Sequence, residues 1–378
     1  MNIQQILDQQ FRANPAYQLV AYDRLAAEEQ AQLGQLAEDA NFYGVLLKEN
    51  EVKAVDPETA LLLMTLREPG TIPTYVRHQF AHKTNHAIVQ LVLDDLLQIQ
   101  VEDAFLSGAA AHAIVYQKDA NRSSATHPLA SLAHDALQYA QALPTATPEQ
   151  LAQRLYLYNI IPFSAQWQRQ LSSETAVKSW LGINGWLDQA WHQLAAESLP
   201  GWRGWRHRQA TVGTLPYKLY VSPTPDQLPT VFRPIVDIFA KHRVATFKIG
   251  KDAHGILRPD KMVAYFPNFE QLAAVSQALQ SELTGCHAQG VPFTAPIDAD
   301  GLLSWGMDPP AEAQIFAGET RESWRFWICQ QLATALITAQ TDNQTIQPWQ
   351  FALDRLHVSG VDTQRWLPAQ SIWKKQTA

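Results

Sequence analysis

Cysteine is scarce in this sequence: Cys286 and Cys329 are the only two among 378 residues. Two cysteines cannot form the disulfide framework of a small secreted domain, which favours a reducing compartment. Neither cysteine lies in a CxxC motif or beside a His/Cys cluster, so the sequence predicts no structural zinc.

Long apolar runs are absent as well. No stretch approaches the ~20 apolar residues that a membrane helix requires. The first fifteen residues, MNIQQILDQQFRANP, lack the basic region and apolar segment of a secretory signal. We therefore expect a cytoplasmic protein that does not bind a membrane.

Two further classes of function are disfavoured. VATFK (244–248) superficially resembles the strand-lysine motif of protein kinases, but no Gly-rich loop precedes it and no HRD or DFG motif follows it. The overall net charge of −7 argues against nucleic acid as a partner, because duplex-binding proteins usually present a wide basic face.

One segment has the opposite charge balance to the rest of the chain. Residues 201–261 hold eleven Lys and Arg against four Asp, a net charge of +7, so the remaining residues carry −14. A local reversal of this size predicts an anion site.

Apolar spacing of three to four residues predicts a mostly helical region from residue 1 to about 143, especially over 25–39, 57–66 and 86–114. A helix start follows: Thr147 is the expected N-cap of a capping box that Gln150 closes. We place a domain boundary there, giving a helical region at 1–146 and a second domain at 147–378.

The second domain has strand patterns as well as helical ones. Segments 216–222, 244–250 and 262–267 predict strands, and helices are expected after Thr224 and Asn268. A turn-rich connection is expected between the second and third strands. The predicted fold class is α+β, with the helical N-terminal region packed on a domain that has a small mixed or antiparallel sheet.

The basic residues of this domain lie on the predicted strands or just after them. Lys218 and Tyr220 leave the same face of one strand, ~7 Å apart. Lys248 lies in the next strand, and Arg258 and Lys261 follow it. If the strands pair, these groups converge on a patch in which arginine binds phosphate and crowded cations lower the pKa of a lysine toward that of a general base. The alternative is ordinary: lysines on the solvent face of a strand, or protecting a sheet edge.

Arg321 and Arg325 lie one helical turn apart beside tryptophans and are candidates to extend the anion site. Arginines in such a position also stack or form structural ion pairs, and this second interpretation stays open.

His78, His82 and His86 have the i, i+4, i+8 spacing of one helical face, which is compatible with zinc, but no acidic or cysteine partner is evident. We predict a solvated or interface helix there and no metal site. Asp94 and Asp95 are adjacent, so they diverge on a helix, and we expect a solvated edge.

Several ordered blocks carry a resemblance to a known family. The blocks 217–226, 246–250 and 256–267 resemble the HopA-type effector family of type III secretion, and 289–310 and 322–333 look like the same family. The likeness covers about residues 200–340. More distantly, the order of Lys-x-aromatic-Val-Ser, Phe-Lys and a lysine before a strand ending in Tyr-Phe-Pro is similar to phosphoserine/phosphothreonine lyase domains.

This resemblance implies a lyase-like second domain that needs neither a metal nor an organic cofactor. Phosphoserine or phosphothreonine in a peptide would lose phosphate by β-elimination, leaving dehydroalanine or dehydrobutyrine. The resemblance implies that Lys248 is the base, that Lys218 stabilises charge, and that Arg258 and Lys261 hold phosphate.

The chain departs from the lyase pattern at one position. Many lyases have Lys-x-His, with the histidine as the acid, where this chain has Tyr220. A tyrosine can serve if nearby cations lower its pKa. The alternative is a non-catalytic protein that binds a phosphorylated or acidic partner in the same basic groove.

HopA-like proteins also occur in lanthipeptide and thioamitide biosynthesis beside a kinase-like protein. The resemblance therefore implies two partners: a phosphorylated precursor peptide and a kinase-like protein that installs the phosphate.

Overall fold

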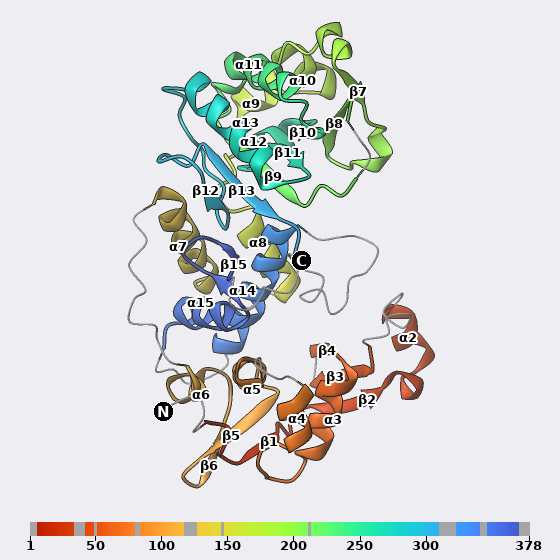
Figure 1. Ribbon diagram of the computed structural model, residues 1–378, viewed down its shortest axis with the longest axis vertical. Coiled ribbons are helices and arrows are strands. Elements are labelled where there is room, and N and C mark those ends of the chain that lie inside the picture. The colour runs from red at the N-terminus through yellow and green to blue at the C-terminus, as the bar shows by residue number, and fades with distance from the viewer. Residues whose placement is uncertain are drawn as a thin grey trace.

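A seven-stranded antiparallel sheet forms the upper part of Figure 1, two small three-stranded sheets lie in the lower part, and helices lie between them. The predicted α+β class is confirmed. The computed structural model describes residues 6–33, 42–48, 51–79, 84–116, 127–144, 147–210, 213–309, 323–340 and 346–369.

The large sheet contains the three predicted strands. Its order is β12-β13-β9-β11-β10-β8-β7, and every neighbouring pair is antiparallel. In chain order the strands are β7 (Trp191–Gln193), β8 (Trp202–His207), β9 (Tyr217–Val221), β10 (Thr246–Gly250), β11 (Met262–Phe266), β12 (Ala295–Pro296) and β13 (Leu303–Met307).

Two helices cover one face of this sheet. Apolar residues of α11 (Leu228–Lys241) and α13 (Phe269–Glu282) pack in one cluster with alternate residues of the central strands, among them Leu219, Phe247 and Ala264. Leu219 and Val221 lie in this cluster and Tyr220 lies in a separate one, so the two faces of β9 alternate as predicted, although both faces are buried.

The remaining elements near this sheet are short. The connection from β10 to β11 contains α12 (Ala253–Leu257), where we expected turns. Before the sheet come α9 (Ala165–Gln170), α10 (Glu174–Trp180), η4 (Gly185–Gln189) and η5 (Ala196–Ser198).

The N-terminal region is only partly helical, so that part of our prediction is wrong. Its helices and turns are η1 (Tyr22–Arg24), α2 (Ala27–Leu33), α3 (Pro57–Thr65), α4 (Thr74–Gln79), α5 (Thr84–Leu93), α6 (Gly108–Val115) and α7 (Pro128–Gln141). Two sheets, β1-β5-β6 and β2-β3-β4, contain β1 (Phe11–Ala13), β2 (Gln18–Ala21), β3 (Gly44–Lys48), β4 (Glu51–Val55), β5 (Leu97–Val101) and β6 (Ala104–Leu106).

The turn after α5 explains one of these errors. Asp95 adopts φ 64°, which ends the helix and lets β5 and β6 follow within the segment that we predicted as helical. Asp95 is not at a solvated edge: its carboxylate accepts hydrogen bonds from Lys48 at 2.8 Å and Ser107 at 2.6 Å. Asp94 accepts two hydrogen bonds from Arg355, at 2.7 and 2.8 Å. The expectation of a solvated edge is therefore wrong.

The histidine pattern is interrupted. Helix α4 ends at Gln79 and α5 begins at Thr84, so His78 and His86 lie on different helices, and His82 lies outside the described residues. The single helical face that we expected for these residues is therefore wrong.

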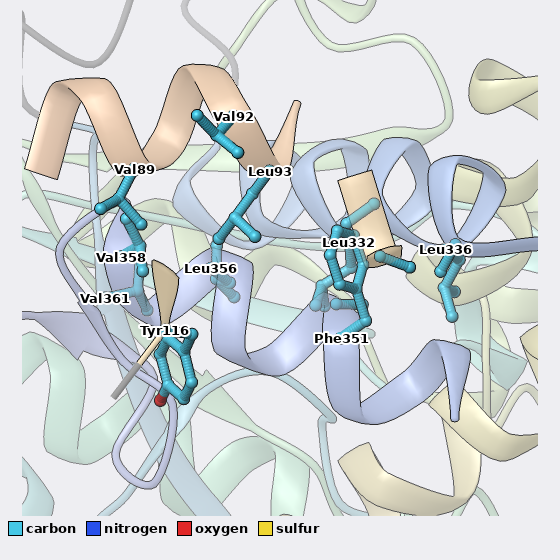
Figure 2. Close-up of a cluster of buried hydrophobic side chains, with 14 of the residues drawn as sticks. Val89, Val92, Leu93, Tyr116, Leu332, Leu336, Phe351, Leu356, Val358 and Val361 are labelled. Atoms are coloured by element: carbon cyan, nitrogen blue, oxygen red, sulfur yellow. The ribbon is translucent and has the colours of Figure 1, made fainter. Parts of the chain in front are cut away.

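The C-terminal helices belong to the core of the N-terminal region. These are α14 (Trp324–Gln340) and α15 (Pro348–Val358), followed by the short β14 (Val361–Asp362) and β15 (Leu367–Pro368). Figure 2 shows their side chains packed against those of α5. The apolar cluster thus draws residues from both sides of position 146, and the division into two domains there stays a prediction. None of the helices among the described residues has the length and apolar content needed to cross a membrane.

The predicted capping box is present at α8 (Pro148–Tyr156). The Thr147 hydroxyl accepts a hydrogen bond from the Gln150 backbone N–H at 3.3 Å, and the Gln150 side chain accepts one from the Thr147 backbone N–H at 3.3 Å. This geometry fixes where α8 begins, and α8 carries Tyr156 into the candidate site described below.

We expect Thr147→Ala to lower the free energy of unfolding by about 1 kcal/mol, because it removes the side-chain acceptor of the cap. Thr147→Ser keeps the acceptor and is expected to have a smaller effect. Urea titrations followed by circular dichroism measure both, and equal losses in the two variants would contradict the capping role.

Candidate functional site

The strand register brings three predicted residues onto the face of the large sheet that α11 and α13 leave uncovered. Lys248 on β10 is opposite Val263 on β11, which is opposite Tyr220 on β9. Lys218 on β9 is opposite Tyr265 on β11. Since opposite residues share a face, Lys218, Tyr220 and Lys248 lie on one face, as predicted. Strands β9 and β10 are interior strands, so protection of a sheet edge does not explain these lysines.

Lys248 has the most distinctive environment of the three. Its ammonium lies 4.2 Å from the centre of the Trp202 ring and 5.7 Å from that of Tyr265. It has no hydrogen-bonding or ion-pair partner among the described residues, and it is partly exposed. Burial lowers the pKa of Lys248 to about 8; nearby Lys218 and Arg258 contribute to the decrease, and Asp260 opposes it.

Lys218 forms an ion pair with a carboxylate that was not among the predicted site residues. Its ammonium donates to Asp308, just beyond the end of β13, and lies 6.0 Å from the Tyr265 ring centre. The side chain is almost buried. This ion pair keeps a positive charge in place on the same face as Lys248.

Tyr220 does not have the properties that we predicted for a proton donor. It is buried in a small apolar cluster with Val263 and Val291. Burial raises its pKa well above the usual range, and the positive charge of Arg325 opposes this without reversing it. The condition under which Tyr220 could serve as the acid, a pKa lowered by nearby cations, is therefore not met.

Arg258 lies beside Lys248 and is fixed by a buried carboxylate. Its guanidinium donates two hydrogen bonds to Asp260, both at 2.8 Å, and lies 5.0 Å from the Trp202 ring centre. Trp202 thus contacts both Arg258 and Lys248. A tryptophan face attracts cations, so it offsets part of the repulsion between the two groups.

Asp260 joins this arrangement to two helices. It also accepts hydrogen bonds from the Tyr156 hydroxyl of α8 at 3.0 Å and from Arg325 of α14 at 3.1 Å. Burial alone would raise the pKa of Asp260, but Arg325 and Arg258 hold it well below its usual range. The site therefore lies where the large sheet meets α8 and α14 (Figure 1).

The other predicted phosphate ligands are placed differently. Lys261 is fully buried, and its ammonium donates to the Pro223 carbonyl at 2.9 Å and to Gln289. Burial lowers its pKa to about 7. Arg325 is fully buried as well, and it donates to Asp260, to the Pro292 carbonyl and to the Tyr156 carbonyl. Direct phosphate binding by either group does not fit these positions, because both side chains are fully buried and bond to acceptors inside the protein. Arg321 lies outside the described residues.

Sequence reasoning missed four members of the site: Tyr265, Asp308, Asp260 and Tyr156. Only Tyr265 had a usable signal, since alternation along β11 places it two residues from Val263 on the same face. The roles of Asp260 and Asp308 depend on partners from other elements, which spacing along the chain does not show.

No family model matches this chain, and no curated protein does. The chain is similar to the structure of an effector protein from Pseudomonas syringae pv. tomato strain DC3000, with 13% identity, coverage of 65% of this chain and 98% of that one, and a TM-score of 0.40.

Two phosphothreonine lyases are also similar in structure. For OspF from Shigella flexneri the identity is 12%, the coverage 38% of this chain and 78% of that one, and the TM-score 0.28. For SpvC from Salmonella the identity is 10%, the coverage 53% of this chain and 97% of that one, and the TM-score 0.28. Because these identities and TM-scores are low, the proposal below rests on the geometry of the site.

Proposed function

We propose that this chain is a cofactor-independent lyase that removes phosphate from phosphoserine or phosphothreonine in a peptide by β-elimination. The observation that carries the proposal is the environment of Lys248: a partly exposed amine with a pKa of about 8, no partner among the described residues, and cationic neighbours. An amine of this kind is deprotonated in a useful fraction near neutral pH and can act as a general base.

The remaining groups fit the charges that such a reaction develops. The Lys248 amine takes the Cα proton, the electron pair forms the Cα–Cβ double bond, and the Cβ–O bond breaks as phosphate leaves. Lys218 and Arg258 place positive charge where the enolate-like oxygen and the phosphate carry negative charge. The leaving phosphate also needs a proton. In our proposal the Lys218 ammonium supplies it, because it lies on the same face as Lys248, whereas the Tyr220 hydroxyl is enclosed in an apolar cluster.

Incubation with a phosphothreonine peptide tests the proposal directly. We expect mass spectrometry to show loss of phosphoric acid, and a thiol added afterwards to form an adduct with the dehydroamino acid. Phosphate release without the alkene would indicate hydrolysis and contradict β-elimination.

A second candidate is a non-catalytic protein that binds a phosphorylated or acidic partner through the same cations. The burial and raised pKa of Tyr220 favour it, since no group with a lowered pKa stands where lyases have their acid histidine. Fluorescence anisotropy with the same peptide separates the two candidates: tight binding without any elimination supports this second function.

We also propose the two partners that the reaction requires. The substrate is a phosphorylated precursor peptide, as in lanthipeptide-type biosynthesis, and a separate kinase-like protein installs its phosphate, since this chain lacks kinase motifs. Adding candidate kinases and unphosphorylated precursor to the purified protein tests this pairing.

The pKa of Lys248 predicts the pH dependence of the reaction. Only the deprotonated amine is a base, so kcat/KM is expected to rise with pH up to about 8 and then to level off. The substrate phosphate, with a second pKa of about 6, is already a dianion over most of this rise. Initial rates across the neutral and mildly alkaline range measure the profile, and a rate that falls with pH there would exclude Lys248 as the base.

A further inference from the structure

A pocket of about 500 Å³ opens beside α12. Most of its lining is apolar and comes from three segments: the chain after α8, the end of α9 and α12 itself. The principal apolar residues are Ile160, Ile161, Pro162, Phe163, Leu171 and Leu257. Phe163 is 59% exposed, so a large apolar surface faces solvent at this point.

Two walls of the pocket are formed by residues that are close in sequence to residues of the candidate site. Leu257 immediately precedes Arg258, the guanidinium of which lies over the Trp202 ring beside Lys248. The opposite wall begins four residues after Tyr156, which bonds Asp260. The Ile161 backbone N–H donates to the Leu257 carbonyl at 3.0 Å and holds the two walls together. Each of these two walls therefore lies within four residues, along the chain, of a group in the candidate site.

The lining also indicates what kind of group the pocket accepts. No lysine or arginine is among the described residues that line it, so the lining does not favour a second phosphate site. Its one carboxylate, Asp252, is already bonded to the Gly255 backbone N–H at 2.9 Å, as the cap of α12. The other polar residues of the lining are Ser172, Ser173 and His254. Since the rest is apolar, the pocket is suited to an aliphatic or aromatic side chain.

We propose that this pocket binds an apolar side chain of the phosphorylated peptide substrate, a few residues away from the residue that loses phosphate. This inference rests on the proposed function, because it assumes that the peptide is anchored at Lys248 and Arg258. An extended peptide rises about 3.3 Å per residue, so neighbouring residues of the substrate reach the pocket while the phosphate stays in place. The pocket then makes the protein selective for phosphorylated sites that have a large apolar neighbour.

A leucine scan tests this selectivity. A single leucine is moved through the positions on both sides of phosphothreonine in a Gly/Ser peptide, and both Kd by anisotropy and kcat/KM for elimination are measured. Leucine at one or two positions is expected to improve binding and kcat/KM about tenfold over the leucine-free peptide. Phe163→Ala, which removes apolar wall, and Ser172→Trp, which fills the pocket, are expected to abolish the preference. Val52→Ala, a change at another exposed apolar residue, is expected to leave it intact.

The outcomes separate this inference from the proposed function. Equal binding and turnover at every leucine position would overturn the pocket proposal while leaving the lyase function in place. A preference that persists in both pocket variants would place the apolar contact elsewhere and overturn it as well. Binding without elimination would overturn the proposed lyase function. The dependence of Kd on the leucine position would then still test the pocket proposal. Failure to bind any phosphopeptide would overturn both.

Discussion

Lys248→Ala is expected to reduce the elimination rate by roughly two to four orders of magnitude, the usual contribution of a general base. The ammonium has no hydrogen-bonding partner among the described residues, so the substitution breaks no polar network there and the protein is expected to stay folded. Phosphopeptide binding is expected to weaken far less, because Lys218 and Arg258 keep their charges. Single-turnover kinetics with saturating peptide measure the chemical step alone.

Two control variants make the result specific. Lys248→Arg keeps a positive charge but cannot be deprotonated, so it is expected to bind peptide and fail to eliminate phosphate. Lys251→Ala removes a lysine three residues away that pairs with Glu174 at 3.1 Å, and it is expected to leave the rate unchanged. A wild-type rate in Lys248→Ala would refute its assignment as the base.

Much of the central sheet could be predicted because its signals are local. Alternating apolar residues in β9 identify a strand with one buried face, and two interior strands then place Lys218 and Lys248 on the opposite face. The Thr147 cap is likewise a pattern within four residues. The face of a residue follows from periodicity, so the shared surface of the lysines was accessible from sequence.

How deeply a residue on that face is buried could not be predicted from the sequence. Tyr220 lies on the expected face of β9, yet it is buried, and so is Lys261, which comes just before β11. The Lys261 ammonium, for example, is bound by Gln289. A pattern of period two says which way a side chain points, whereas the packing of distant elements decides whether solvent reaches it. This is why the burial of Tyr220, the predicted proton donor, could not be read from the sequence.

The N-terminal strands show a different limit. β1 and β6 have three residues each and β2 has four, too few for an alternation to stand out from neighbouring helical patterns. The turn at Asp95 depends on Lys48 and Ser107, and its neighbour Asp94 depends on Arg355 far along the chain. Tertiary contacts, and not local preference, fix the structure of this region.

Asp260→Ala is expected to cause a large loss of stability. The carboxylate is 2% exposed and is the shared acceptor of Arg258, Arg325 and Tyr156. Removing it leaves the fully buried Arg325 guanidinium without its counter-charge, which usually costs about 3–5 kcal/mol. Since Asp260 ties α8 and α14 to the sheet, the loss is expected in the unfolding of the whole chain, measured by urea titration.

Asp237→Ala is the matched control, because Asp237 also pairs with an arginine, Arg233, but on the surface, at 3.8 Å with both side chains mostly exposed. Its loss is expected to be at most about 0.5 kcal/mol. Asp260→Asn keeps the shape and one acceptor oxygen while removing the charge, so an intermediate loss is expected. If Asp260→Ala were no more destabilising than Asp237→Ala, the buried carboxylate would not be what holds Arg258 beside Lys248. The placement of the phosphate-binding charge would then need another cause.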